Sequence, residues 1–349
     1  MKLSLIKVSE KYREQICDML DEWYASGENI VPYAIRRIDY HDFSFYCKNL
    51  ENRNILSEWG VTDSTFFCLD TERDRVVGAV NIRHYLNESL LLDGGHIGDG
   101  VRPSERGRGI ATEMIRMALE ECRRLGIYRV LMVCNKDNVA SARTIQKNGG
   151  ILENEVEVDG HTEQRYWITL QAEETATVIR HASLEELSDC VEVIRSSFRT
   201  VAEEFCITEE NAPRFTAFAT DEGRLRYHFC VEKRPMYVCL FGGRIVGYYS
   251  MSVLNEDETE LNNLSVLPEY RHRGIGEALV KDYILKTALI GRKRMKLSLV
   301  EENKVLLHWY ESFGFTYTES KKYDFFPFTC AYMEKKGTAP GDGSRQEQQ

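Results

Sequence analysis

The sequence lacks an excess of basic residues: Lys and Arg number 45 against 55 Asp and Glu, for a formal net charge of −10. Proteins that bind nucleic acid or an anionic membrane surface generally present a basic surface, so this balance argues against both partners. An apolar run of about 18 residues, which a membrane-spanning helix needs, is also missing. Residues 1–11 alternate apolar and polar and then turn charged, unlike a signal peptide. These absences predict a cytoplasmic protein.

Closely spaced metal ligands and cysteine pairs are missing too. The ten cysteines are scattered without a C-x-x-C pair, and many lie in apolar runs such as residues 130–134. They are therefore predicted to be buried, reduced thiols rather than a disulfide or zinc framework. The eight histidines show no spacing of the H-E-x-x-H kind, so we predict no metal site.

An internal repeat is the most informative feature that is present. Shifting the sequence by 165 residues aligns Val101–Gly149 with Val266–Gly314 without a gap, with 10 identities in 49 positions. At about 150 residues per domain, 349 residues also predict two domains. We expect domains at residues 1–171 and 177–336, followed by a small, polar, disordered tail at 337–349.

Each half is predicted to be α+β, with a mixed, mostly antiparallel central sheet flanked by helices. In the second half, residues 236–241 and 244–252 read as a hairpin, 260–267 and 294–300 as strands, and 276–289 and 305–313 as helices. The first half repeats this order: a hairpin near Asp74, a strand to Val101, helices at 112–124 and 139–147, and a strand at 129–134 between them.

Two hexapeptides lie at equivalent places in the repeat, each after a strand and a Pro and each opening a helix. They consist of Arg106, Gly107, Arg108, Gly109, Ile110 and Ala111, and of Arg271, His272, Arg273, Gly274, Ile275 and Gly276. Successive backbone N–H groups at a helix N-terminus form an anion-binding concavity. The Arg side chains are expected to add donors for phosphate oxygens. A Rossmann fingerprint fits poorly, because Thr112 stands where a third Gly or Ala is required.

These hexapeptides resemble the pyrophosphate loop Arg/Gln-x-x-Gly-x-Gly/Ala of the GNAT superfamily, the acyl-CoA-dependent N-acetyltransferases. The family usually has an Asn after the next strand, here Asn138 and Asn303, and a Gly-Phe after the following helix. Gly314-Phe315 matches that pattern, whereas Gly149-Gly150 departs from it. The resemblance implies two tandem GNAT-like domains that bind acetyl-CoA in a V-shaped gap between splayed strands. Val101 and Val266, both loops and both Asn residues would contact it.

Acyl transfer from a thioester to an amine needs a base for the amine, a donor for the oxyanion and an acid for the leaving thiolate. The resemblance places the acid at Tyr310, four residues before Gly314; the alternative is a core aromatic. Glu260, 11 residues before Arg271, is the candidate base, or else a solvated strand end. An ungapped repeat aligns Tyr310 with Ile145 and Glu260 with Gly95.

The first half therefore departs from the catalytic pattern, and His96 is its candidate base or a hydrogen-bonded strand residue. The run 138–143 is similar instead to the branch of the family that acetylates ribosomal-protein N-termini. The aromatic run 323–328 is interpreted as core and turn in preference to a substrate cage.

The leading hypothesis is an acetyl-CoA-dependent N-acetyltransferase that acts on a primary amine by direct attack, with the second domain the better-equipped catalyst. Two alternatives stay open: a non-catalytic first domain that binds acyl-CoA or recruits substrate, and two domains active on different amines. The sequence does not identify the amine, and it is compatible with a homodimer.

Overall fold

The computed structural model describes residues 1–50 and 60–337. The chain divides into two compact units, the first made of Met1–Glu173 with Ser183–Glu185 and the second of Glu174–Ala182 with Glu186 onward. Of the expected tail at 337–349, all but Gly337 lies outside the described residues. No helix within the described ranges is long and apolar enough to cross a membrane. The ten cysteines all lie in those ranges, where none forms a disulfide.

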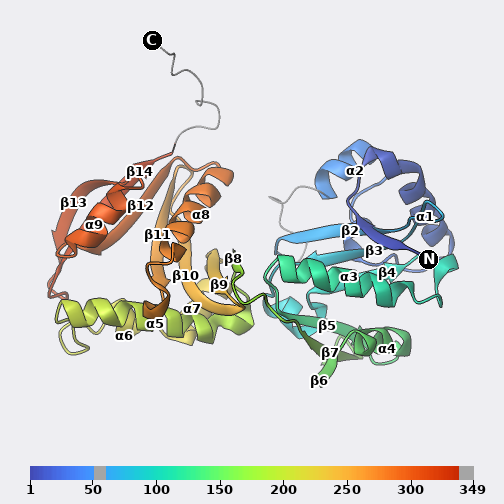
Figure 1. The fold of residues 1–349 in the computed structure, drawn as a ribbon, viewed down its shortest axis with the longest axis horizontal. Helices are drawn as coiled ribbons and strands as arrows, with labels where there is room; N and C mark the ends of the chain where they lie inside the picture. Colours follow the sequence, from blue (N-terminus) through green and yellow to red (C-terminus); the bar gives the residue numbers. More distant parts are fainter. Residues whose placement is uncertain (51–59, 338–349) are drawn as a thin grey trace, which may run out of the picture. The chain divides into compact units, whose positions relative to one another are not determined.

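The first unit begins with a strand, two helices and an antiparallel hairpin, and it ends with a second antiparallel hairpin (Figure 1). Its elements are β1 (Leu3–Ile6), α1 (Arg13–Ala25), α2 (Phe43–Leu50), β2 (Asp63–Asp70), β3 (Arg75–Arg83), β4 (Ile97–Val101), α3 (Ile110–Arg124), β5 (Arg129–Asn135), α4 (Val139–Lys147), β6 (Ile151–Val158) and β7 (His161–Thr169). The strands form two antiparallel sheets, in the orders β1-β2-β3-β4 and β5-β7-β6.

Helices cover both faces of the β1–β4 sheet. Successive residues of a strand point to opposite faces, and the core follows this alternation. Cys68 and Val77 belong to the apolar cluster that includes the buried residues of α3, whereas Phe67 and Val76 belong to the cluster of α1 and α2. Each face of the sheet is therefore buried, as the apolar runs of β2 and β3 require.

The second unit has one continuous sheet in the order β13-β14-β12-β11-β10-β9-β8. Its elements are β8 (Thr177–His181), α5 (Leu187–Glu204), α6 (Thr216–Ala219), α7 (Glu222–Cys230), β9 (Met236–Phe241), β10 (Arg244–Val253), β11 (Glu258–Val266), α8 (Ile275–Leu289), β12 (Arg294–Val300), α9 (Lys304–Glu311), β13 (Thr316–Lys322) and β14 (Thr329–Lys336). Of these pairings, β11 with β12 is parallel and the others are antiparallel. Both units thus confirm the α+β, mostly antiparallel fold class.

Two adjacent tyrosines of β10 show which helix lies on which face of this sheet. The Tyr249 hydroxyl donates to Asp282 of α8 at 2.6 Å. Tyr248, the preceding residue, faces the opposite side of the strand, where burial and then the nearby Cys190 of α5 raise its pKa. Helices α5 and α8 therefore pack on opposite faces of the β10–β11 region.

Candidate active site

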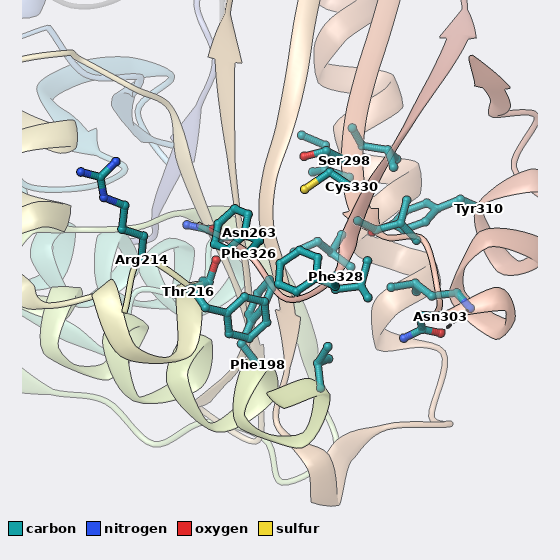
Figure 2. A pocket seen from close by; sticks show the side chains of 18 residues that line it. Phe198, Arg214, Thr216, Asn263, Ser298, Asn303, Tyr310, Phe326, Phe328 and Cys330 are labelled. Carbon is teal, nitrogen blue, oxygen red and sulfur yellow. Dashed lines mark hydrogen bonds between the residues drawn. The ribbon is translucent and has the colours of Figure 1, made fainter. Parts of the chain in front are cut away.

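The two central strands of the second unit separate partway along their length. β11 pairs with β12 through Glu258↔Arg294, Thr259↔Met295 and Glu260↔Lys296, and the pairing then stops. Beyond that point each strand continues on its other neighbour, β10 or β14. A cavity of about 250 Å³ lies in the opening, with leucines of both strands in its lining (Figure 2). This gap has the form that the sequence resemblance implies.

Tyr310 of α9 lines this cavity and is 6% exposed. Its ring packs against Trp309 at 5.0 Å and Phe315 at 5.8 Å between centroids. Among the described residues its hydroxyl has no hydrogen-bond partner. Burial raises the pKa of Tyr310 above its ordinary value, so the hydroxyl stays protonated near neutral pH. The residue is therefore a buried proton donor whose hydroxyl is available to a ligand.

Glu260 occupies the point at which the strands part. It is the last residue of β11 in the pairing with β12, and its side chain is half-buried. The next residue, Leu261, lines the cavity, whereas Glu260 itself does not. A proton from a ligand in the cavity would therefore reach Glu260 through a water molecule rather than by direct contact.

A β-bulge interrupts β11 beside the cavity. Tyr248 pairs with Ser265 and Ser250 pairs with Asn262, so Asn263 and Leu264 together oppose one residue of β10. Asn263 adopts a φ of +52° and lines the cavity (Figure 2). A bulge leaves a residue outside the regular ladder, and here that residue lies at the gap.

The two hexapeptide loops have the same backbone conformation. Gly107 and His272 have φ values of +75° and +60°, and Gly109 and Gly274 both have +80°. Among the described residues, no acceptor takes the backbone N–H groups of residues 107–109 or 272–274. These amides lie directly before α3 and α8, where the helix dipole adds positive potential. Each loop is therefore a concavity of open donors suited to phosphate oxygens.

The arginine side chains of these loops are in contact with other residues of the chain. Arg106 makes a two-pronged ion pair with Glu28 at 3.0 and 2.6 Å. Arg271 donates to the backbone oxygen of Ser197 at 3.0 Å. Arg108 pairs with Glu105, and Arg273 packs over the Tyr270 ring at 5.2 Å. These contacts hold the four arginines at the loops, and donation from their side chains to phosphate oxygens stays a prediction.

Both asparagines predicted to contact acyl-CoA act as helix caps. The Asn138 side chain accepts from the Ser141 N–H at 3.1 Å, and the Asn303 side chain accepts from the Leu306 N–H at 3.0 Å. Asn303 also lines the cavity. The remaining predicted contacts, Val101, Val266, Ile110, Ile275, Ala111 and Gly276, lie at the strand ends and helix starts that flank the loops. Four of them, Val101, Val266, Ile110 and Ile275, are buried, so they offer backbone rather than side chain to a ligand.

The bulge corrects the ungapped alignment of the repeat. Strand β4 pairs with β3 without a register shift, from Gly78↔Val101 to Ile82↔Ile97. Val266 of β11 is equivalent to Val101 of β4. Counted back from these two residues, β11 contains one more residue than β4 because of the bulge. Glu260 therefore corresponds to His96 and not to Gly95. The neighbouring strands support the same correspondence. Glu260 pairs with Lys296 of β12, and the His96 N–H donates to the backbone oxygen of Leu131 of β5 at 2.7 Å. Leu131 is the residue that the 165-residue repeat aligns with Lys296.

His96, directly before β4, is held by hydrogen bonds to β5. It is 1% exposed, and its Nδ1 accepts from the Leu131 N–H at 3.0 Å. This bond ties β4 to β5 at the place where they begin to separate. The geometry favours the structural alternative for His96 over the role of base.

Asp99 is a functional candidate in the first unit that the sequence analysis missed. It shares the α3 face of β4 with Ile97 and Val101. Within the described ranges no hydrogen bond or ion pair reaches its carboxylate. Burial raises its pKa to about 6, and Asp99 contributes, after burial and Glu163, to the raised pKa of Cys134. A sequence signal existed, since an Asp interrupts an otherwise apolar strand end.

The aromatic run of the second unit contributes to the cavity. Phe326 and Phe328 line it together with Phe198 of α5 and Phe215 before α6 (Figure 2). Phe215 and Phe328 are also core residues, at 6% and 7% exposed. Phe328 thus agrees with the interpretation of residues 323–328 as core and turn, and Phe326 and Phe328 also line the cavity. No group of His, Cys, Asp and Glu that could hold a metal ion occurs in the part of the chain that the structure describes.

Comparison with known families matches both units. A model described as "Acetyltransferase (GNAT) domain" matches residues 14–151, and a second model of the same description matches residues 232–317. The chain therefore belongs to the GNAT acetyltransferase family and contains two such domains.

Individual relatives are more distant. A Bacillus methanolicus protein described as an uncharacterized N-acetyltransferase in the lysA 3′ region is 38% identical over 50 residues, which is 14% of this chain and 42% of that protein. PaiA N-acetyltransferase from Thermoplasma acidophilum, solved with coenzyme A, is 21% identical, with a TM-score of 0.40 over 46% of this chain and 99% of that one. The Escherichia coli ribosomal-protein-S18-alanine N-acetyltransferase is 17% identical, with a TM-score of 0.37 over 49% and 99%.

Proposed function

We propose that the protein transfers an acetyl group from acetyl-CoA to a primary amine, and that the second unit carries the better-equipped active site. The observation that supports this most is the cavity between β11 and β12, into which Tyr310 projects with no other partner for its hydroxyl among the described residues. The open amides of residues 272–274 would bind the pyrophosphate, with the thioester in the gap between the strands.

Three groups of this chain would support the reaction. The amine nitrogen attacks the thioester carbonyl carbon, and a backbone N–H of the Asn263 bulge would stabilise the oxyanion. The C–S bond then breaks, and Tyr310 would donate its proton to the thiolate. The proton lost by the amine would pass through water to Glu260. Glu260 then releases its proton to solvent and the tyrosinate takes one up from solvent, so both groups return to their starting states.

Glu260→Gln tests the base. A Lys-like amine with a pKa of about 10.4 is mostly protonated at pH 7, so loss of the base should lower turnover roughly 10²-fold at pH 7. The difference in turnover between wild type and variant should shrink toward pH 9, where a larger fraction of the amine in solution is neutral. The measurement is turnover of wild type and variant from pH 7 to 9, with Glu256→Gln, an exposed residue of the preceding turn, as control. A wild-type rate at every pH would exclude Glu260.

A second candidate function, in which the first unit is also catalytic, is supported by Asp99. Its carboxylate lies on the α3 face, as does Ile145, which the repeat aligns with Tyr310. A carboxyl with a pKa near 6 exchanges protons near neutral pH, so Asp99 would protonate the thiolate in place of a tyrosine. A partly buried carboxylate without a partner among the described residues lowers stability and is typical of a functional site.

Stability against pH checks the state of Asp99. Because its pKa in the folded protein, about 6, exceeds the ordinary value of 3.8, the ionised form destabilises the fold. The destabilisation is absent below pH 4, appears between pH 4 and 6, and persists above pH 6. Asp99→Asn should therefore raise the free energy of unfolding of the first unit at pH 8 by up to about 3 kcal/mol. At pH 4 it should have little effect.

Hydrogen exchange of the β3–β5 amides, measured on the full chain, would report the stability of the first unit alone. Asp137→Asn, in the exposed turn after β5, is the control. It should leave the exchange of these amides unchanged at both pH 4 and pH 8. An effect of Asp99→Asn that is equal at pH 4 and pH 8 would contradict the assignment.

A further inference from the structure

We propose that the cavity of the second unit selects a small monoamine with an apolar body, such as an aryl or branched alkyl group, and binds it as the neutral amine. The proposal rests on the acetyl-transfer function proposed for the same site, and it names the class of acceptor. A polyamine, a lysine side chain or a polar amine would be a poor substrate.

Four phenylalanine rings form a continuous wall on the α5 side of the cavity. Phe198 and Phe215 lie 5.9 Å apart between centroids, Phe215 and Phe328 5.6 Å, and Phe328 and Phe326 4.7 Å. The first two pairs meet edge to face and the third is stacked. The rings come from α5, from the segment before α6 and from the segment before β14 (Figure 2). Three separate segments thus supply one aromatic surface, which a polar acceptor would not use.

The charges around the cavity agree with an apolar acceptor. The titratable side chains in its lining are Arg214, Tyr310 and Cys330, and none of the lining residues is acidic. Arg214 is exposed, lies 5.7 Å from the Phe325 ring and extends away from the other rings (Figure 2). Glu260 adjoins the lining without joining it. A second or third ammonium group of a polyamine would therefore be buried without a carboxylate partner, which is strongly unfavourable.

The size of the cavity limits the apolar body. Its volume of about 250 Å³ lies below the roughly 300–1,000 Å³ of pockets for drug-sized ligands. Part of it must also hold the acetyl group beside Tyr310. The remaining space fits a single ring or a short branched chain, so we expect a small amine as acceptor.

An apolar site also determines the protonation state of the acceptor. Burial without a counter-charge disfavours an ammonium ion and lowers its pKa. The neutral amine is the nucleophile, so the cavity would select the reactive form, and Glu260 would need only to receive a proton through water. The second-order rate constant kcat/KM should then rise about tenfold per pH unit below the amine's own pKa, because the neutral fraction rises in that proportion.

The test compares 2-phenylethylamine with ethanolamine and spermidine, using the full chain and acetyl-CoA. We expect kcat/KM for 2-phenylethylamine to exceed that for the other two at least roughly tenfold, since contacts in an apolar pocket discriminate about 10–200-fold. Phe326→Ala should raise KM for 2-phenylethylamine roughly tenfold and leave that for ethanolamine within about twofold. Phe325→Ala is the matched control, because Phe325 is the adjacent residue, is 48% exposed and does not line the cavity.

Titration calorimetry of each variant with CoA separates this proposal from the acetyl-transfer function. CoA binding with spermidine or ethanolamine as the preferred acceptor would overturn the proposed acceptor class alone. An equal decrease in kcat/KM for all three amines in Phe326→Ala would also overturn the proposed acceptor class. If no variant, wild type included, binds CoA, the acetyl-transfer function itself fails.

Discussion

Replacing Tyr310 with Phe should lower turnover roughly 10²–10⁴-fold while CoA affinity stays within about twofold. The hydroxyl is the part that donates a proton, and among the described residues it has no partner that would change on its removal. The ring stays packed against Trp309 and Phe315, so the fold should be unaffected. The measurement is steady-state turnover of full-length chain with 2-phenylethylamine, together with calorimetric titration by CoA.

The matched control is Tyr317→Phe. Tyr317 lies on β13, is 45% exposed and does not line the cavity, and its hydroxyl donates to Glu301 at 3.3 Å. It should leave turnover unchanged. A Tyr310→Phe enzyme with wild-type turnover would show that another group protonates the thiolate.

Gly274→Glu should lower turnover of the second unit at least roughly 100-fold by preventing CoA binding. The substitution places a carboxylate among the open amides, and a like-charge contact with pyrophosphate costs several kcal/mol. It also forces a side chain onto a φ of +80°. Added volume is not the cause, because an added Cβ at this position meets nothing within 4 Å.

Gly291→Glu separates charge at the loop from backbone strain. Gly291 follows α8, has a φ of +74°, and has equally open surroundings. Both variants therefore carry similar strain of about 1–2 kcal/mol, but Gly291 does not belong to the loop. Equal loss of activity in the two variants would contradict the role of the loop in binding.

Local structure was predictable where turn residues bracket a clear pattern. The helix at residues 139–147 and the strand at 294–300 were expected with the bounds that α4 and β12 have. Edge strand β13 carries no such pattern, because all its side chains are exposed and apolar alternation arises only where one face is buried. The loop backbone was also predictable, since glycine at 109 and 274 allows the positive φ that both adopt.

The parts of the site that depend on tertiary contacts could not be read from the sequence. A bulge formed by Asn263 has no glycine to mark it, so an ungapped repeat paired Glu260 with the wrong residue. Phe198 and Phe328 are separated by 130 positions and meet through Phe215 only in the folded unit. The arginines of the loops matched the family's motif, but the partners of two of them, Glu28 for Arg106 and Ser197 for Arg271, lie far away in the sequence.

Calorimetric titration of the full chain with acetyl-CoA tests the central claim most directly. Because both loops present the same open backbone, the account predicts two equivalents bound, one of them lost in Gly274→Glu and the other in Gly109→Glu. No binding at all, or binding that survives both substitutions together, would contradict the account.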